Sequence, residues 1–342
     1  MSLVKYCFKI IVFSLTILKF CSKVVLSNCK RCQKTLTKFL GVIIMKSSVK
    51  RFLVILSSII AMLGITTIAT TEVHAAAAKV SPISTVATTT MYSKKMHLDW
   101  NYDVYLPAGY NPSANKKYPV LYMMHGLYGN HRNLLERFNS QQMLDGAMKR
   151  NHQKAIVVFI DGFNSFYVNQ KGGLQMESAI MKDLIPKINS TYKVSSSKED
   201  HAIGGISMGG YAAARLSLKY SNYFSKALLI SPSVWYSLAK DNPIRMNMHA
   251  FTNGKTNWSD KVYDGLFPTN YINKKSKSVK FYVETTSDDT TVPIKNVNRF
   301  VKTLKKDKIS VKYVKDTGDN HNWAYWTKAT PKSYNWLMQE FK

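Results

Sequence analysis

The stretch Gly205-Ile206-Ser207-Met208-Gly209-Gly210 decides how the chain around it is expected to fold. It fits the pattern G-x-S-x-G, in which a serine stands on a sharp turn between a strand and a helix. The preceding residues 201–206 are predicted to form a strand, and the alanine-rich residues 208–220 are predicted to form a helix. Small neighbours suit such a turn because its strained backbone leaves no room for Cβ atoms. The pattern therefore predicts a nucleophilic hydroxyl at Ser207.

On both sides of this turn, short apolar runs alternate with segments of helical spacing. The run 102–106 alternates like an edge strand, whereas 118–124 is continuously apolar, as in a strand buried on both faces. Alternating strands and helices predict βαβ units and a mostly parallel central sheet with helices on both faces, an α/β fold. The remaining predicted strands are 155–160, 226–230, 279–285 and 311–314, and the remaining predicted helices are 134–148, 175–189, 294–305 and 334–341.

A serine hydroxyl needs a base and an orienting acid, and in this fold they follow the serine in the order acid, then histidine. His321 is the only histidine after His249 and is predicted to be the base. Two adjacent carboxylates, Asp288 and Asp289, directly follow a predicted strand, and either could orient the imidazole. Asp288 is the preferred acid of the two, and Asp316, five residues before the histidine, is the weakest candidate.

The oxyanion formed during acyl transfer needs two backbone N–H donors. The residue after the nucleophile, Met208, is predicted to supply one of them. The loop after the early strand, which begins at His125-Gly126, is predicted to supply the other through Leu127 N–H. His125 itself is expected to shape this turn through hydrogen bonds rather than to act as a second base.

Four runs resemble the putative esterase family: residues 104–110, 118–126, 205–210 and 321–326. This family includes esterase D, tributyrin and feruloyl esterases and mycolyltransferases. The resemblance covers about residues 92–342 and implies an α/β-hydrolase fold and a carboxylic ester substrate. By motif position it also implies Ser207 as nucleophile, His321 as base, and Leu127 and Met208 as oxyanion donors. The family's acid usually stands in a Gly-x-x-Asp setting, whereas here Thr-Thr-Ser precedes a double Asp.

The N-terminal quarter contains a secretory pattern that begins inside the chain. Lys46, Lys50 and Arg51 precede the apolar run 52–70, and small residues near Ala75 offer a cleavage site. Residues 45–75 are therefore predicted to be a signal peptide, with an uncleaved anchor as the alternative. Residues 1–44 are predicted to be an extension upstream of a true start at Met45.

The rest of the chain is organised as a short leader and one large domain. Residues 76–91, rich in Ala, Ser and Thr, are expected to be a flexible leader, and 92–342 to be the catalytic domain. Within it, 233–275 breaks the alternation of strands and helices and is rich in aromatic residues. Because long loops in compact domains are usually functional, this segment is predicted to be a cap, with a surface loop as the alternative.

Charge and cysteine content limit the classes of partner. The chain has 48 Lys and Arg against 20 Asp and Glu, and the part beyond residue 75 still carries a net charge of about +18. The basic residues are scattered, which argues against specific nucleic-acid binding and favours loose adherence to anionic cell-wall polymers. All four cysteines lie within residues 1–32, and no H-E-x-x-H pattern is present. No metal or other cofactor is predicted.

The function predicted from these features is a secreted serine esterase that acts on short acyl, acetyl or feruloyl esters through an acyl-enzyme. A signal peptide fits poorly with cytosolic formylglutathione hydrolysis. An acyltransferase that passes the acyl group to a sugar or wall polymer is the enzymatic alternative. A wall-adhering binding protein on an inactive hydrolase scaffold is the non-enzymatic one.

Overall fold

The computed structural model describes residues 80–341 of the chain. The predicted extension 1–44, the signal peptide 45–75, the start of the leader and all four cysteines lie outside these residues. Within the described part, no helix is both long and apolar enough to cross a membrane.

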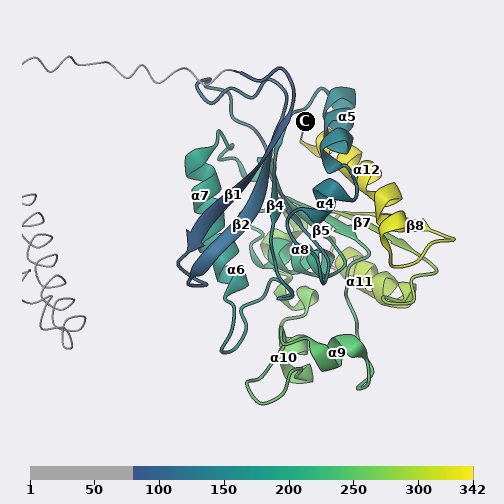
Figure 1. Ribbon diagram of the computed structural model, residues 1–342. Helices are drawn as coiled ribbons and strands as arrows, with labels where there is room; N and C mark the ends of the chain where they lie inside the picture. The colour runs from purple at the N-terminus through teal and green to yellow at the C-terminus, as the bar shows by residue number, and fades with distance from the viewer. Residues whose placement is uncertain (1–79, 342) are drawn as a thin grey trace, which may run out of the picture. The chain divides into compact units, whose positions relative to one another are not determined.

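The described residues form an eight-stranded sheet in the order β1-β2-β4-β3-β5-β6-β7-β8 (Figure 1). The first two strands are joined antiparallel, β2 also pairs antiparallel with β4, and all later pairings are parallel. This is the α/β-hydrolase fold that the sequence predicts. The strands are β1 (Thr85–Ser93), β2 (Leu98–Leu106), β3 (Val120–Met124), β4 (Ile156–Ile160), β5 (His201–Ile206), β6 (Lys226–Ile230), β7 (Lys280–Thr286) and β8 (Val311–Asp316).

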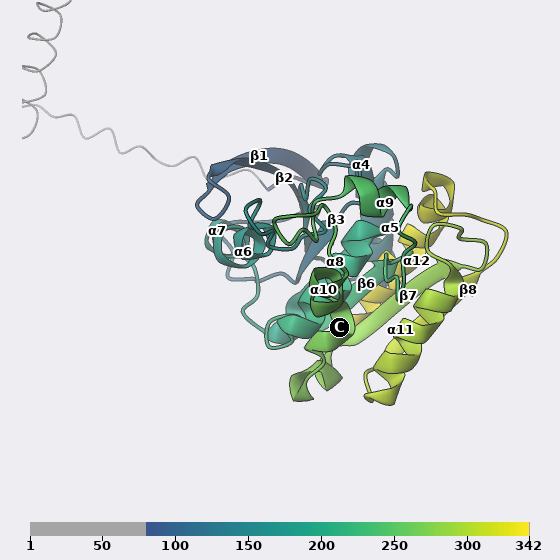
Figure 2. The same cartoon turned by 90° about the horizontal axis from the view of Figure 1, so that it is seen from below.

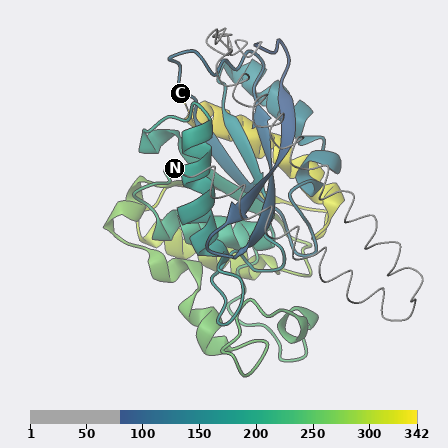
Figure 3. The same ribbon diagram turned by 60° about the vertical axis from the view of Figure 1, so that its left-hand side comes forward.

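Helices cover both faces of the sheet, because the central strands are apolar on both sides. One face packs against α4 (Asn133–Glu136), α5 (Ser140–Asn151) and α12 (Trp323–Glu340). The other packs against α8 (Met208–Lys219), α11 (Ile294–Lys306) and a continuous helical run made of α6 (Met176–Ala179), the π-turn η1 (Ile180–Leu184) and α7 (Ile185–Thr191). In Figure 3 the yellow α12 lies behind the strands and the teal helices lie in front of them.

Three sequence expectations about elements are wrong. The leader expected over 76–91 is not all flexible, since Thr85–Ser93 forms β1 along the whole of β2. As a result the edge of the sheet is β1, and the strand predicted over 102–106 lies one place inward. The closing helix predicted from Tyr334 begins at Trp323 instead and runs through Pro331. Proline disfavours a helix interior, but burial of α12 against the sheet outweighs that preference.

The segment 233–275 follows β6 at the carboxyl edge of the parallel strands. It contains α9 (Pro243–Asn247), α10 (Asp260–Gly265) and the short 3-10 helix η3 (Pro268–Tyr271), and it ends inside a second 3-10 helix, η4 (Lys274–Ser278). Its aromatic side chains pack on one another, as Phe251 does on Trp258 and Tyr263. Helices α9 and α10 project below the sheet in Figure 1 and therefore lie nearest the viewer in Figure 2. Its role as a cap stays a prediction.

Candidate active site

Ser207 stands on a strained turn between β5 and α8. Its backbone has φ 55° and ψ −113°, a region that residues with a Cβ atom rarely adopt. The flanking positions must be glycine, because a Cβ atom at either one would collide with the backbone. A Cβ on Gly205 would lie 2.4 Å from the backbone carbon of Gly209, and a Cβ on Gly209 would lie 2.2 Å from the carbonyl oxygen of Met124. The G-x-S-x-G spacing therefore allows β3, β5 and α8 to approach closely around the serine.

Backbone hydrogen bonds hold this turn from both sides. Ser207 N–H donates to the carbonyl of Ile230 at the end of β6 (2.9 Å), and Ser233 N–H donates to the carbonyl of Ser207 (3.1 Å). Only 7% of Ser207 is exposed. The hydroxyl is thus fixed in position at the carboxyl edge of the sheet, where loops from several strands meet.

His321 reaches Ser207 from the loop between β8 and α12. Its Nε2 lies 2.7 Å from Ser207 Oγ, and its Nδ1 lies 2.7 Å from Asp289 Oδ2. The next residue, Asn322, caps α12 by accepting a hydrogen bond from Tyr325 N–H. The ring of Trp326 packs edge-on against the imidazole at 5.0 Å. Helix capping and aromatic packing together fix the orientation of the imidazole.

The structure contradicts the choice of Asp288 as the partner of His321, since Asp289 holds that place. Asp289 Oδ1 accepts the N–H groups of Thr291 (3.0 Å) and Val292 (2.7 Å), which leaves Oδ2 directed at the imidazole. Asp288 turns the other way and accepts the N–H of Gly318 (2.6 Å). The physical reason is the tight turn after β7, which points the two adjacent side chains in different directions.

Asp316, the weakest of the three candidate acids, lies apart from the imidazole contacts. Its carboxylate accepts hydrogen bonds from Lys332 (3.0 Å) and from the Tyr325 hydroxyl (3.2 Å). It therefore belongs to a charged group between β8 and α12.

The loop that carries Leu127 lies against the serine. A Cβ on Gly126 would stand 3.4 Å from Ser207 Cβ, so a larger residue would crowd the hydroxyl. Met208 is the first residue of α8, where an N–H has no acceptor within the helix. Among residues 80–341, neither Leu127 N–H nor Met208 N–H is hydrogen-bonded. Met208 therefore adjoins Ser207 in the chain, and the glycine before Leu127 lies against it. The role of both N–H groups as oxyanion donors stays a prediction.

His125 is buried and hydrogen-bonded at both ring nitrogens. Its Nδ1 lies 2.7 Å from the carbonyl of Gly126, and its Nε2 accepts the N–H of Gly162 (2.9 Å). With Nε2 accepting, the Nδ1 proton is donated to the Gly126 carbonyl. His125 therefore joins the loops after β3 and β4, which is the structural role expected for it.

Two contacts of the site were not found from the sequence. The Ser233 hydroxyl lies 3.1 Å from Ser207 Oγ. The side chain of Asn320 accepts hydrogen bonds from His321 N–H (2.7 Å) and Thr290 N–H (3.0 Å) and so ties the histidine loop to the loop of Asp289. The run Asp319-Asn320-His321 contains residues that favour such turns, but nothing in it identifies the acceptor of each bond.

The chemistry available here is that of an activated hydroxyl beside backbone N–H donors. Within residues 80–341, no three His, Cys, Asp or Glu side chains are grouped as metal ligands. The arrangement of carboxylate, imidazole and serine recurs on unrelated folds as a device for acyl transfer.

The chain is similar to several esterases of known sequence. An acetyl esterase of Caldicellulosiruptor saccharolyticus is 28% identical over 232 residues, which cover 64% of this chain and 83% of the relative. An endo-1,4-beta-xylanase/feruloyl esterase of Xylanibacter ruminicola is 28% identical over 137 residues, but these make up only 19% of that larger protein.

Solved structures share the fold at lower identity. A ferulic acid esterase superimposes with a TM-score of 0.65 at 22% identity, covering 76% of this chain and 99% of the other. FphF of Staphylococcus aureus, a fluorophosphonate-binding serine hydrolase, gives 0.63 at 18% identity, covering 75% and 99%. A family model described as "Putative esterase" matches residues 93–336. The chain belongs to this esterase family of the α/β-hydrolase superfamily and is a carboxylic ester hydrolase.

Proposed function

We propose that this esterase is secreted and hydrolyses acetyl, feruloyl or other short acyl esters by means of Ser207, His321 and Asp289. The observation that carries the proposal is the chain of two 2.7 Å contacts from Asp289 through His321 to the Ser207 hydroxyl. The strained turn under Ser207 supports it, because strain of this kind concentrates at functional positions.

The first half-reaction forms an acyl-enzyme. His321 Nε2 takes the proton of Ser207 as Oγ attacks the ester carbonyl carbon, and the carbonyl oxygen becomes negatively charged. Leu127 and Met208 N–H groups stabilise that oxygen by donating hydrogen bonds to it. The C–O bond to the alcohol then breaks, and the alcohol leaves with the proton that His321 returns.

The second half-reaction releases the acid. Water loses a proton to His321 while its oxygen attacks the acyl carbon, and the proton then returns to Ser207 Oγ as the ester bond to the enzyme breaks. Asp289 keeps Nδ1 protonated throughout and stabilises the positively charged imidazole. Since Asp289 is itself held by two backbone N–H groups on Oδ1, its Oδ2 stays directed at the imidazole.

The substrate class is supported by the names of the relatives, which include an acetyl esterase and feruloyl esterases. Secretion is supported by the signal-like pattern in residues 45–75. The positive charge of the chain supports weak adherence to anionic wall polymers. Sequencing the N-terminus of exported protein tests secretion, and a start near Ala76 is the expected result.

The nucleophile is tested with Ser207→Ala, assayed on p-nitrophenyl acetate. We expect kcat/KM to fall by about 10⁴-fold or more, because the attacking atom is removed. Ser233→Ala is the matched control, since it removes the neighbouring hydroxyl, and a loss of less than about tenfold is expected from one lost hydrogen bond. An inactive Ser233→Ala together with an active Ser207→Ala would show that Ser207 is not the nucleophile.

The ester is tested with a panel of acetyl-sugar, feruloyl, short-chain and long-chain substrates. The proposal predicts higher kcat/KM on acetyl or feruloyl esters than on long-chain ones. Adding a sugar alcohol to the assay separates hydrolysis from acyl transfer, which stays an alternative prediction. A product ester that outweighs the free acid would replace the proposed hydrolase with a transferase.

A further inference from the structure

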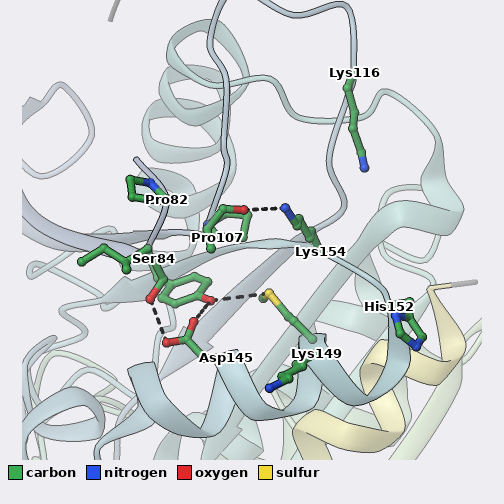
Figure 4. A pocket seen from close by; sticks show the side chains of 12 residues that line it. Pro82, Ser84, Pro107, Lys116, Asp145, Lys149, His152 and Lys154 are labelled. Atoms are coloured by element: carbon green, nitrogen blue, oxygen red, sulfur yellow. Dashed lines mark hydrogen bonds between the residues drawn. The ribbon is translucent and has the colours of Figure 1, made fainter. Parts of the chain in front are cut away.

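A cavity of about 590 Å³ lies at the amino edge of the parallel strands, away from Ser207. Its lining comes from the residues before β1 and β3, from the end of β2 and from the last turns of α5 (Figure 4). Ser207 and Leu127, by contrast, follow the carboxyl ends of β5 and β3. A five-residue strand such as β4 separates the two edges by about 16 Å. A ligand in this cavity would not touch the reacting hydroxyl.

The walls of the cavity are mostly apolar, and positively charged lysine side chains lie at one end. Tyr105, Met148 and Ile83 supply apolar surface. In Figure 4, Lys116 and Lys154 lie in the upper half of the view, whereas Asp145 and Lys149 lie below them on α5. A cavity of this volume lies within the range of about 300–1,000 Å³ usual for small-molecule sites, which are mostly apolar with a few polar groups.

The acidic residue of the cavity is already satisfied by neighbours. Asp145 accepts hydrogen bonds from the Tyr105 hydroxyl (2.6 Å) and from the Ser84 hydroxyl (2.9 Å). Lys154 donates one hydrogen bond to the Ala108 carbonyl (2.5 Å), and an ammonium group has three donors in all. The lysine end of the cavity therefore attracts an anion, while the Asp145 end repels one, which would orient a bound ligand.

One exposed apolar side chain borders the cavity. Ile83 is 70% exposed, although large apolar side chains are usually covered in a folded chain. A ligand with an apolar body would remove part of this surface from water, a favourable change. Neither the charges nor Ile83 is used by the reaction at Ser207.

We propose that this cavity is a second ligand site that binds a carboxylate carried on an apolar body, with the carboxylate at Lys116 and Lys154 and the body on Ile83, Met148 and Tyr105. An esterase releases a carboxylic acid at each turnover, so ligands of this class are formed by the protein itself. The proposal does not depend on which residues perform the hydrolysis.

The test is calorimetric titration of the whole chain with cinnamate, after fluorophosphonate has blocked the reactive serine. We expect saturable binding with a stoichiometry of one and weaker binding of cinnamamide, which has the same body without the charge. Octanoate is the second arm: tighter binding than cinnamate identifies an alkyl ligand, and weaker binding an aromatic one. Loss of all binding after the serine is blocked would overturn the proposal, since the acid would then occupy only the active site.

Two variants with matched controls locate the site. Lys116→Glu replaces an attractive charge with a repulsive one at the lysine end of the cavity and should weaken cinnamate binding by about fivefold, a change typical of exposed ion pairs. Lys305→Glu reverses a charge in the last turn of α11, outside the cavity, and should leave binding unchanged. Ile83→Ser should weaken binding by about threefold through lost apolar contact, whereas Val80→Ser should not.

Circular dichroism and thermal unfolding verify that these surface variants fold. Equal affinities in Lys116→Glu and Lys305→Glu would overturn the proposal, because the carboxylate would then lie elsewhere.

Discussion

Two histidine–aspartate pairs in this molecule have almost the same geometry. His321 Nδ1 lies 2.7 Å from Asp289 Oδ2, and His131 Nδ1 lies 2.8 Å from Asp103 Oδ2. In both pairs the carboxylate side chain is fully buried and the histidine side chain nearly so. Burial and pairing alone therefore do not distinguish the site from its surroundings.

The two pairs differ in the further side chains that contact them. The other nitrogen of His321 faces the Ser207 hydroxyl, whereas the pair at Asp103 is completed by Thr88 (2.5 Å) and Arg132 (3.5 Å) on the carboxylate. Burial alone would raise the pKa of Asp103, but these three partners bring it below its usual value. Asp103 is thus a satisfied anion that fastens the loop after β3 to β2. A histidine becomes a base only where its free nitrogen meets a reactive hydroxyl.

The sharpest test of this difference compares His321→Ala with His131→Ala. The first should lower kcat/KM for p-nitrophenyl acetate by about 10⁴-fold, because no other group accepts the serine proton. The second should lower it by less than about tenfold and act mainly on the thermal midpoint, since it removes one of the three partners of the buried Asp103 carboxylate. Similar losses of activity in both variants, with both folded, would remove the distinction between the pairs.

The adjacent aspartates allow a comparison within one turn. Asp289→Asn should lower kcat/KM by about 10³-fold or more, because the amide no longer stabilises the protonated imidazole. Asp288→Asn should cost less than about tenfold, since an amide oxygen can still accept the Gly318 N–H. Assays of both variants at several pH values check this prediction. A larger loss of kcat/KM in Asp288→Asn than in Asp289→Asn would mean that Asp288, the residue that the sequence favoured, is the acid.

The case of the two aspartates shows where sequence reasoning stops. The strand His201–Ile206 and the following helix were predictable because a glycine-flanked serine between an apolar run and an alanine-rich run fits one local structure. The position of His321 beside Ser207 was predictable from chain order. The carboxylate partner of the imidazole depends on which way two adjacent side chains point, and periodicity does not provide that direction. One signal was present: Asp289 precedes Thr-Thr-Val-Pro, a setting in which a carboxylate accepts N–H groups two and three residues on.

Other errors came from tertiary contacts that override local preference. Thr85–Ser93 is rich in threonine and looks like a polar leader, but it pairs along the whole of β2. Pro331 stands inside α12, and the helix continues because Tyr325, Trp326 and Leu337 are buried against the sheet. In each case the partner surface is distant in sequence, so a window of local residues does not contain the deciding information.

The pair formed by His131 and Asp103 can also be tested by changing its carboxylate. Asp103→Asn should lower the free energy of unfolding by about 3 kcal/mol, because it removes the charge of a fully buried carboxylate that is hydrogen-bonded to Thr88, His131 and Arg132. Asp99→Asn, an exposed change on the same strand, is the control and should shift it by less than about 0.5 kcal/mol. Urea unfolding measures both. Equal stabilities would mean that Asp103 does not fasten the loop.

A third buried carboxylate, Glu284 on β7, has no histidine partner. Its change is expected to have the smallest effect on the free energy of unfolding. Its neighbours are Lys332, with which it forms an ion pair, and the Tyr282 hydroxyl at 2.5 Å. Burial raises the pKa of Glu284 to about 7, against which the hydrogen bonds from Lys332 and Tyr282 act only in part. Unlike Asp103, this group is stabilised in its protonated form.

The consequence is a pH dependence of stability with a definite sign. Between the ordinary pKa of 4.5 and the native value near 7, the folded chain binds more protons at Glu284 than the unfolded chain does. The stability contributed by this group is therefore complete below the lower value and is lost as pH rises through the upper one. Glu284→Gln removes the titration while Lys332 keeps Asp316 as a partner. Relative to this variant, the wild type should lose about 2.5 kcal/mol of unfolding free energy between pH 5 and pH 8. Parallel stability curves in urea would show that Glu284 is ionised across the whole range, as Asp103 is.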